Sequence, residues 1–202
     1  RQEINYVSYD QFGNSILQNV RRYTQTDTLI DYKEITNTYA DPIAARRGNA
    51  THSTIYRYSS DTTLDNTTLI DHQEISNKSF DLIGNIVDQE ILLYVIDHSS
   101  GNVEKLSRKT VINNSSISNR GDAGIQKIWT YVTDNNGSLP AIETSYQEIT
   151  NRVFDSDHNV LNQMVLNYLD SSKNTLLDVQ EIRNLNFDSR GNVLNQIIAT
   201  FS

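Results

Sequence analysis

Residues 180–196, QEIRNLNFDSRGNVLNQ, contain the pattern that decides the fold. Asp188 can accept hydrogen bonds from backbone amides at the start of a type I turn, and Gly191 can take the left-handed conformation that closes the turn. Strands should flank this turn, the first reaching back to Leu176 and the second running forward to Phe201. This stretch therefore predicts a β-hairpin.

The hairpin pattern recurs along the whole chain as a tandem repeat. Each copy contains one turn residue, called the anchor here, and successive anchors are 33 to 37 residues apart. The anchors are Gly13, Gly48, Gly84, Gly121, His158 and Gly191. An aromatic residue follows each anchor by ten positions, as Tyr23, Tyr58, Tyr94, Tyr131, Tyr168 and Phe201. The sequence thus contains about six repeats.

Other positions keep step with the anchors. A glutamine stands five residues after the anchor in all copies except the second, which has Ser53, and an isoleucine stands nine residues before it. Inserted residues displace that isoleucine, Ile35, in the second copy. A strip with the pattern Leu-Ile-Asp-x-x-Glu-Ile recurs at residues 29–35, 69–75 and, with Leu177 in place of isoleucine, 176–182. We expect the glutamines to form a side-chain ladder across strands.

These positions predict an all-β fold of tandem antiparallel β-hairpins that form an extended or coiled sheet, sandwich- or solenoid-like. Helical spacing of the apolar positions is absent, and further turns are expected at 97–102, 134–137 and 170–174. We interpret residues 1–202 as a single repeat array and as a fragment of a longer repeat protein. Apolar residues on both strand faces predict that part of the sheet is covered on both sides.

Composition excludes several classes of function. The formal net charge of −8 and a pI near 4.9 argue against nucleic acid as a partner, because binding the phosphate backbone needs clustered Lys and Arg. The chain contains no cysteine, hence no disulfide and no thiolate nucleophile. No apolar run reaches the roughly 20 residues that a membrane-spanning helix requires. We expect no cofactor.

The turn motif [Phe/Tyr]-Asp-x-x-Gly-[Asn/Asp] occurs at residues 9–14, 80–85 and 187–192, with a close version at 154–159. Gly121-Asp122 keeps only its second half. The motif resembles the tyrosine-aspartate (Rhs) repeats of bacterial secreted and surface proteins. In that family the repeats form hairpins strung into large curved sheets, some enclosing toxins and others serving in adhesion. The longer period of this chain, and the missing Arg-Tyr pair before the motif, favour a plain sheet, a coil or a fibre.

The aromatic residues are candidates for ligand binding. Tyr23, Tyr58, Tyr94, Tyr131 and Tyr168 recur once per repeat, and Trp129 lies near them in sequence. A row of such rings can bind sugars, but tyrosines stacked between strands produce the same pattern.

Metal and cell-binding motifs have simpler explanations in the repeat. Asp155, Asp157 and Asn159 resemble the start of a calcium loop, but the following glycine and the distal glutamate are missing. Turn chemistry therefore explains them. Arg120-Gly121-Asp122 reads as an integrin-type tripeptide, yet it occupies the same repeat slot as residues 190–192.

No residues stand out as catalytic, and we expect no enzyme activity. His52, His72, His98 and His158 have no common offset from the anchor and no metal-ligand spacing, which favours solvated positions. Turn roles are expected for Asp10, Gly13, Gly48, Asp81, Gly84, Gly121, Asp155, His158, Asp188 and Gly191. Because His158 replaces an anchor glycine, we expect it to have a positive φ. Asn-x-Ser/Thr triplets at Asn49, Asn66, Asn77, Asn114 and Asn136 would fit glycosylation.

The function that these observations predict is that of an extracellular or cell-surface structural module, which builds a fibre, sheath or surface layer. Its partners would be copies of itself or flanking repeats, joined through the edges of the sheet. The alternative is a glycan- or cell-binding adhesin module that uses the aromatic strip.

Overall fold

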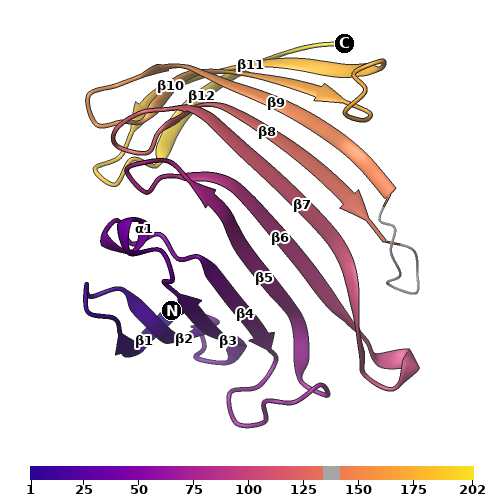
Figure 1. The fold of residues 1–202 in the computed structure, drawn as a ribbon. Helices are drawn as coiled ribbons and strands as arrows, with labels where there is room; N and C mark the ends of the chain where they lie inside the picture. Colours follow the sequence, from indigo (N-terminus) through magenta and orange to yellow (C-terminus); the bar gives the residue numbers. More distant parts are fainter. Residues whose placement is uncertain (134–141) are drawn as a thin grey trace. The chain divides into compact units, whose positions relative to one another are not determined.

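The computed structural model describes residues 1–133 and 142–202, and its strands form one open antiparallel sheet (Figure 1). The strands pair in chain order, so neighbours in the sequence are neighbours in the sheet. Their bounds are β1 Gln2–Tyr9, β2 Ser15–Tyr23, β3 Leu29–Thr38, β4 His52–Tyr58, β5 Leu69–Phe80, β6 Ile86–Asp97, β7 Val103–Ile117, β8 Ala123–Val132, β9 Ile142–Phe154, β10 Val160–Tyr168, β11 Leu176–Phe187 and β12 Val193–Phe201. The prediction of an all-β fold made of tandem hairpins is confirmed.

Each anchor lies between two strands, which we call the first and second strand of a repeat. Repeat 1 is β1 and β2, and the numbering continues to repeat 6, which is β11 and β12. Within a hairpin, the isoleucine of the first strand lies opposite an apolar residue of the second strand. The described pairs are Ile4 with Val20, Ile35 with Ile55, Ile75 with Ile91, Ile149 with Val165 and Ile182 with Ile198.

The turns have the geometry that their sequence requires. All six anchors have positive φ, from 67° at His158 to 101° at Gly121. In repeat 6 one carboxylate oxygen of Asp188 accepts hydrogen bonds from the backbone N–H groups of Arg190 and Asn192, at 2.8 and 2.9 Å. The other oxygen accepts from the Asn192 side chain at 2.7 Å. The Asp188 carboxylate therefore holds the turn with hydrogen bonds, and the anchor supplies the positive φ that the turn requires.

The same bonds recur around Asp10, Asp81 and Asp155 in repeats 1, 3 and 5. In repeat 4 serine replaces the aspartate that opens the turn, and aspartate replaces the asparagine that ends it. There the Ser118 hydroxyl donates to the Asp122 carboxylate at 2.9 Å and accepts from the Asp122 backbone N–H at 3.1 Å. The turn survives this exchange because a hydroxyl can also accept the backbone hydrogen bond.

Repeat 2 differs because its inserted residues form a short helix, α1 Pro42–Arg46. Asp41 caps the helix by accepting hydrogen bonds from the N–H groups of Ile43 and Ala44, and Pro42 occupies the first helical position. A Cβ atom added at Gly84 of the next turn would lie 2.9 Å from backbone atoms of Ala44. Gly84 is thus required both by its φ of 87° and by this close approach.

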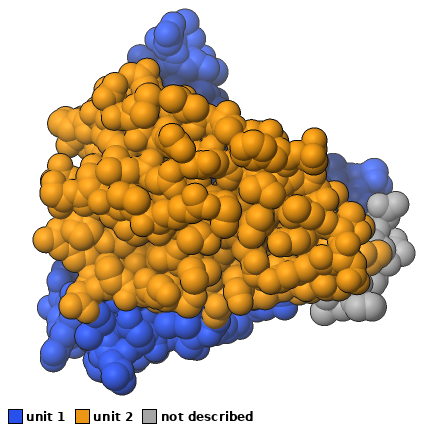
Figure 2. All heavy atoms as spheres, turned by 90° about the horizontal axis from the view of Figure 1, so that it is seen from above, with its two compact units in different colours: residues 1–110, 132–141 blue, residues 111–131, 142–202 orange. Residues whose placement is uncertain are grey.

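The chain divides into two compact units, coloured separately in Figure 2. Unit 1 is Arg1–Thr110 with Val132–Ala141, and it contains the hairpins of repeats 1 to 3. Unit 2 is Val111–Tyr131 with Ile142–Ser202, and it contains the hairpins of repeats 5 and 6. Repeat 4 contributes residues to both. The turn predicted at 134–137 lies outside the described residues.

All described strands belong to one sheet, with no second sheet among the described residues to pack against it. The buried apolar residues are accordingly few: Val20, Tyr32, Ala44, Ala45, Leu69, Tyr146 and Val165. A 3-10 turn, His98–Ser100, precedes β7. Within the described part of the chain, no helix is long and apolar enough to cross a membrane.

Candidate functional site at the repeat junction

A recurring feature of the molecule is the junction, which we define as the pairing of the second strand of one repeat with the first strand of the next. The junctions β2/β3, β4/β5 and β10/β11 share one register. In each, the residue five after the anchor lies opposite the isoleucine of the strip, as Gln18–Ile35, Ser53–Ile75 and Gln163–Ile182. The register shifts at the same point in all three, immediately before the aromatic residue. The recurring strip is therefore the strand sequence that fits a junction.

An asparagine two residues after the isoleucine fixes this register with hydrogen bonds. We call it the clamping asparagine. Asn184 donates from Nδ2 to the backbone carbonyl of Val160 in the preceding repeat, and its Oδ1 accepts from Gln196 in its own hairpin, both at 2.7 Å. Both ends of the amide are used, so one side chain aligns a hairpin and a junction together. Equivalent asparagines are Asn37, Asn77 and Asn151, which donate to the carbonyls of Ser15, Ala50 and Ala123.

The predicted glutamine ladder exists in this form, as one glutamine-to-asparagine rung in each of four hairpins. The rungs are Gln89–Asn77, Gln126–Asn114, Gln163–Asn151 and Gln196–Asn184, with N···O distances of 2.7 to 2.9 Å. In repeat 2, the Ser53 hydroxyl replaces glutamine and donates to Asn37 at 2.7 Å.

The aspartate of the strip makes a second contact across the junction. It lies opposite the residue nine after the preceding anchor, in the pairs Arg22–Asp31, Arg57–Asp71 and Asn167–Asp178. The first two pairs are salt bridges, and the third is a hydrogen bond of 2.6 Å. Asp31 is 1% exposed and also lies 3.9 Å from Arg57. The hydrogen bonds from Arg22 lower the pKa of Asp31 despite its partial desolvation, so the carboxylate stays charged.

Stacked side chains form a third contact, which we call the ring sandwich. The central group is the residue three before the isoleucine of the first strand. One flanking group lies eight residues after the anchor of the preceding repeat. The other lies ten residues after the anchor of the same repeat. In the β4/β5 junction, the His72 ring lies 4.3 Å from the Tyr56 ring and 5.0 Å from the Tyr94 ring, tilted by only 14° and 16°. Both faces of the imidazole are therefore covered.

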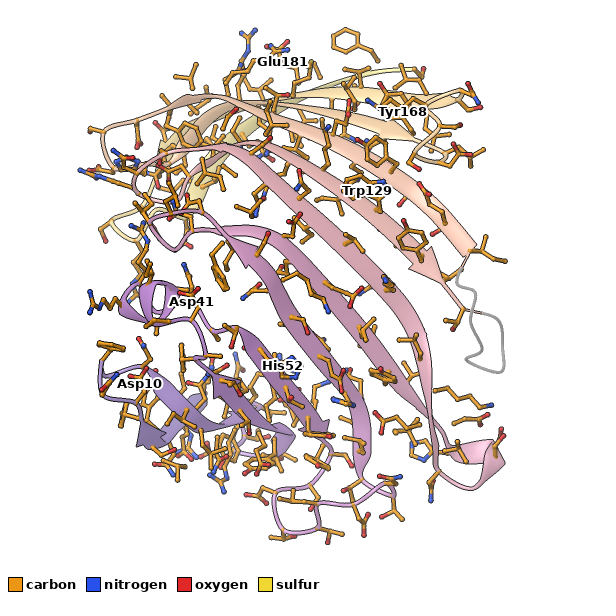
Figure 3. All side chains as sticks on the ribbon, viewed as in Figure 1. Asp10, Asp41, His52, Trp129, Tyr168 and Glu181 are labelled. Carbon is orange, nitrogen blue, oxygen red and sulfur yellow. The ribbon has the colours of Figure 1, made fainter. Side chains whose placement is uncertain are left out.

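Two other ring sandwiches use the same three positions, but their rings are tilted by 32 to 43° and not stacked. Tyr146 lies 5.1 Å from Trp129 and 6.0 Å from Tyr168, and Figure 3 labels these two flanking residues. The Tyr32 ring lies 6.3 Å from the Tyr58 ring. On its other side the flanking group is a guanidinium, that of Arg21 on the preceding strand, 5.1 Å from the Tyr32 ring. The central groups His72, Tyr146 and Tyr32 are 6, 2 and 4% exposed.

Burial of these sandwiches changes the ionisation of their tyrosines. Desolvation is the main cause that raises the pKa of Tyr32, Tyr56, Tyr58 and Tyr94. Desolvation also raises the pKa of Tyr146, whose hydroxyl donates to Glu148 at 2.7 Å. The Lys173 ammonium lies 2.6 Å from the same Glu148 carboxylate and 5.6 Å from the Tyr146 ring. The raised pKa values keep the hydroxyl groups of these tyrosines protonated.

His72 corrects the expectation that the histidines are solvated. It is buried because it occupies the central slot that Tyr32 and Tyr146 fill in other repeats, and its Nδ1 pairs with Glu104. His98 is exposed, and His52 is half-buried and hydrogen-bonded to Ser76 at 3.1 Å. His158 is half-buried, with its Nδ1 2.5 Å from the Asp122 carboxylate of the preceding turn.

The predicted aromatic strip is divided among the sandwiches. Tyr58, Tyr94, Trp129 and Tyr168 are flanking rings, whereas Tyr23 lies beneath the Arg1 guanidinium at 4.6 Å. Tyr131 lies on β8, two residues after Trp129. A sugar packs against an aromatic face, and each flanking ring already lies against a central ring, stacked in the case of Tyr94 and tilted in the case of Tyr58, Trp129 and Tyr168. The strip therefore offers a ligand less ring surface than its sequence pattern suggests.

The other candidate motifs are turns. Both oxygens of Asp155 accept hydrogen bonds from within its turn, from Asp157 and from Asn159. Asp122 of the Arg-Gly-Asp tripeptide accepts from Ser118 and contacts His158. Over residues 1–133 and 142–202, no group of three or more His, Cys, Asp or Glu is placed to hold a metal ion.

The glycosylation triplets place their asparagines in hydrogen bonds. Asn49 and Asn66 donate to the backbone carbonyls of Gly84 and Asn102, while Asn77 and Asn114 are rungs of the glutamine ladder. Asn136 lies outside the described residues.

Sequence reasoning missed the clamping asparagine and the central ring slot. The asparagine is visible in the sequence, two residues after the isoleucine in every repeat except the first, which has Tyr6. The central position of the ring sandwich is not restricted to one residue type. Its members Tyr32, His72 and Tyr146 are recognised as equivalent only because each stands three residues before an isoleucine.

Comparison with known proteins adds no relative. A scan against protein-family models finds no match, and a search of curated proteins finds no significant match. The resemblance to tyrosine-aspartate repeats therefore stays a prediction based on the turn motif.

Proposed function

We propose that this chain is an extracellular structural repeat module that builds a fibre, sheath or surface layer. The observation that carries the proposal is the common use of the recurring side chains. Asparagine, aspartate and the central ring all join one repeat to the next, through Asn184–Val160, Arg57–Asp71 and Tyr56–His72 for example. A catalytic group is needed once, whereas these groups recur in register.

The arrangement of strands supports the same proposal. A meander whose contacts run mainly between neighbours lengthens by adding repeats, without any change to the existing ones. Repeats 2, 3 and 6 carry the strip, and it pairs with the second strand of the repeat before each of them. The extracellular or cell-surface location is inferred from the resemblance of the turn motif to tyrosine-aspartate repeats.

Electron microscopy of the native assembly tests the proposal. We expect fibres, sheaths or continuous layers that antibodies against this chain label outside the cell. Dispersed single particles at the site of production would contradict it. A glycan array provides the second arm, since tight sugar binding that is lost in Tyr94→Ala would favour the adhesin function instead.

A further inference from the structure

The three ring sandwiches share a carboxylate, and two of them also share a basic side chain. Each has a glutamate two residues after its central group, at Glu34, Glu74 and Glu148. The Arg21 guanidinium lies 5.1 Å from the Tyr32 ring. The Lys173 ammonium lies 5.6 Å from the Tyr146 ring and forms an ion pair with Glu148 at 2.6 Å. A cation over the central ring is therefore part of these two sandwiches.

The sandwich centred on His72 is different. In the part of the chain that the structure describes, no lysine or arginine lies over the Tyr56 or Tyr94 ring, and the ion pairs of Glu74 and Glu104 are with His72 alone. The imidazole is thus the basic group of this sandwich. Its protonation decides whether a cation is present between the rings.

Both nitrogens of the His72 ring face carboxylates. Nδ1 pairs with Glu104 on β7, and Nε2 lies 3.7 Å from Oε1 of Glu74 on its own strand. Nε2 is buried and makes no hydrogen bond. A neutral imidazole has one N–H, so a ring that donates to Glu104 turns a lone pair toward the Glu74 carboxylate. The imidazolium carries N–H groups on both nitrogens, which removes this repulsion and gives each carboxylate a cation.

The remaining groups around the ring favour the same charge. Tyr56 from β4 and Tyr94 from β6 cover its two faces, and burial raises the pKa of both tyrosines, so their rings stay neutral up to alkaline pH. Neutral aromatic faces attract a cation. Glu34 on β3 adds negative charge near Tyr56, and Glu90 on β6 adds it near Tyr94, although two lysines hold Glu90 in ion pairs.

We infer that His72 is a proton-dependent lock, whose imidazolium ties β5 to Glu104 of β7 and to Glu74 and whose loss of the proton loosens the β4/β5 junction. Histidine changes its charge between about pH 5 and 8. The unfolded chain offers His72 neither the two carboxylates nor the two rings. The stabilisation is therefore complete at pH 5.5, where both states carry the proton, and is lost as the pH rises to 8. The lock operates in the single chain, independently of assembly.

Urea denaturation at pH 5.5 and at pH 8 tests the lock, since glutamates are ionised and tyrosines are protonated at both values. We expect the ratio of folded to unfolded chain, at a fixed urea concentration, to fall about tenfold more in the unaltered protein than in His72→Tyr. Tyrosine fills the same position in two other repeats, as Tyr32 and Tyr146, but does not titrate in this range. The matched control His98→Gln alters an exposed histidine and should keep the full pH effect.

Two further variants test the carboxylates without changing the ring. Glu74→Gln and Glu104→Gln should each remove about half of the pH effect on a logarithmic scale, while Asp27→Asn, at a 70% exposed side chain, should leave it unchanged. These variants decide the matter alone if His72→Tyr does not fold. A pH effect that His72→Tyr or both glutamine variants leave intact would overturn the lock. Greater stability of the unaltered protein at pH 8 would overturn it too, because the folded state would then prefer the neutral imidazole.

Discussion

The junctions β4/β5 and β10/β11 have the same backbone register but different side chains at their centres. In β4/β5 the central residue is His72, stacked between two tyrosines, and the polar pair is the salt bridge Arg57–Asp71. In β10/β11 the central residue is Val179, opposite Leu166, and the polar pair is Asn167–Asp178.

Contacts present in both junctions define a junction, and contacts present in only one of them strengthen it. The register shift before the aromatic residue and the clamping asparagine are present in both junctions, at Asn77 and at Asn184. The stacked rings are present in only one of them. Register therefore comes from the asparagine and the strand ladder, and the ring sandwich adds stability.

The largest expected effect is at His72, with Val179 as its counterpart in the other junction. His72→Ala should lower the free energy of unfolding by about 3 kcal/mol, because it empties a buried slot between two rings. Val179→Ala should cost about 1 kcal/mol, because a half-buried valine loses less apolar contact. Urea denaturation of both variants measures the difference.

His72→Phe separates stacking from the contact with Glu104. It keeps a ring between Tyr56 and Tyr94 and should recover at least half of the loss in His72→Ala. Equal destabilisation by His72→Ala and Val179→Ala would show that the ring sandwich contributes nothing specific.

Alkaline pH should weaken the β4/β5 junction, whose centre is a ring sandwich, more than the β10/β11 junction. Burial raises the pKa of Tyr56 and Tyr94 in the folded state above the ordinary value of about 10. As the pH rises past 10, the unfolded chain loses these protons first, so the contribution of these tyrosines to stability is complete below that pH and falls above it. Urea denaturation from pH 8 to 11.5 should show this fall, and Tyr56→Phe should make it shallower. An unchanged slope in Tyr56→Phe would exclude Tyr56 as a source of the pH dependence.

The clamping asparagines should behave alike in the two junctions. Asn77→Ala and Asn184→Ala each remove one donated and one accepted hydrogen bond, and each should cost about 1 to 2 kcal/mol. Denaturation curves of the two variants give the comparison. If the costs differed by more than about 1 kcal/mol, the clamp would not be a constant element of the junction.

The smallest expected effect is at the anchor of repeat 5. His158→Gly relieves about 1 kcal/mol of backbone strain at a φ of 67° but loses the contact with Asp122. The two terms oppose each other, so thermal denaturation should show a net change within about 0.5 kcal/mol.

Gly191→Ala is the reverse change in the next turn. Its Cβ would lie 2.7 Å from the Asn159 side chain, at a φ of 79°. We expect a loss of about 1 kcal/mol. A stabilised Gly191→Ala would contradict the assignment of both anchors to one turn type.

The hairpins could be predicted because their signals are local. An aspartate that opens a turn and an anchor that closes it act within a few residues, and six copies make the pattern unambiguous. The strip at 69–75 was visible as a repeat, but only the pairing of β4 with β5 shows that its aspartate meets Arg57 and its leucine meets Tyr58.

The remaining features depend on contacts between repeats. His72 looked solvated because its slot is defined by stacking and not by residue type. Helix α1 has signals of its own in Asp41 and Pro42, a capping residue followed by proline, but these residues are an insertion that the other repeats do not share. The asparagine clamp was obscured by the many other asparagines in the chain.

The most direct test of the whole account is the periodicity of the assembled protein. Each repeat adds two strands, and neighbouring strands lie about 4.8 Å apart, so oriented assemblies should diffract at about 4.8 Å and repeat at about 9.6 Å along the direction of growth. Both spacings should lie along the same axis. Assemblies without a strand spacing along the direction of growth, or a protein whose two edge strands are covered by elements of its own chain that are not repeats, would contradict it.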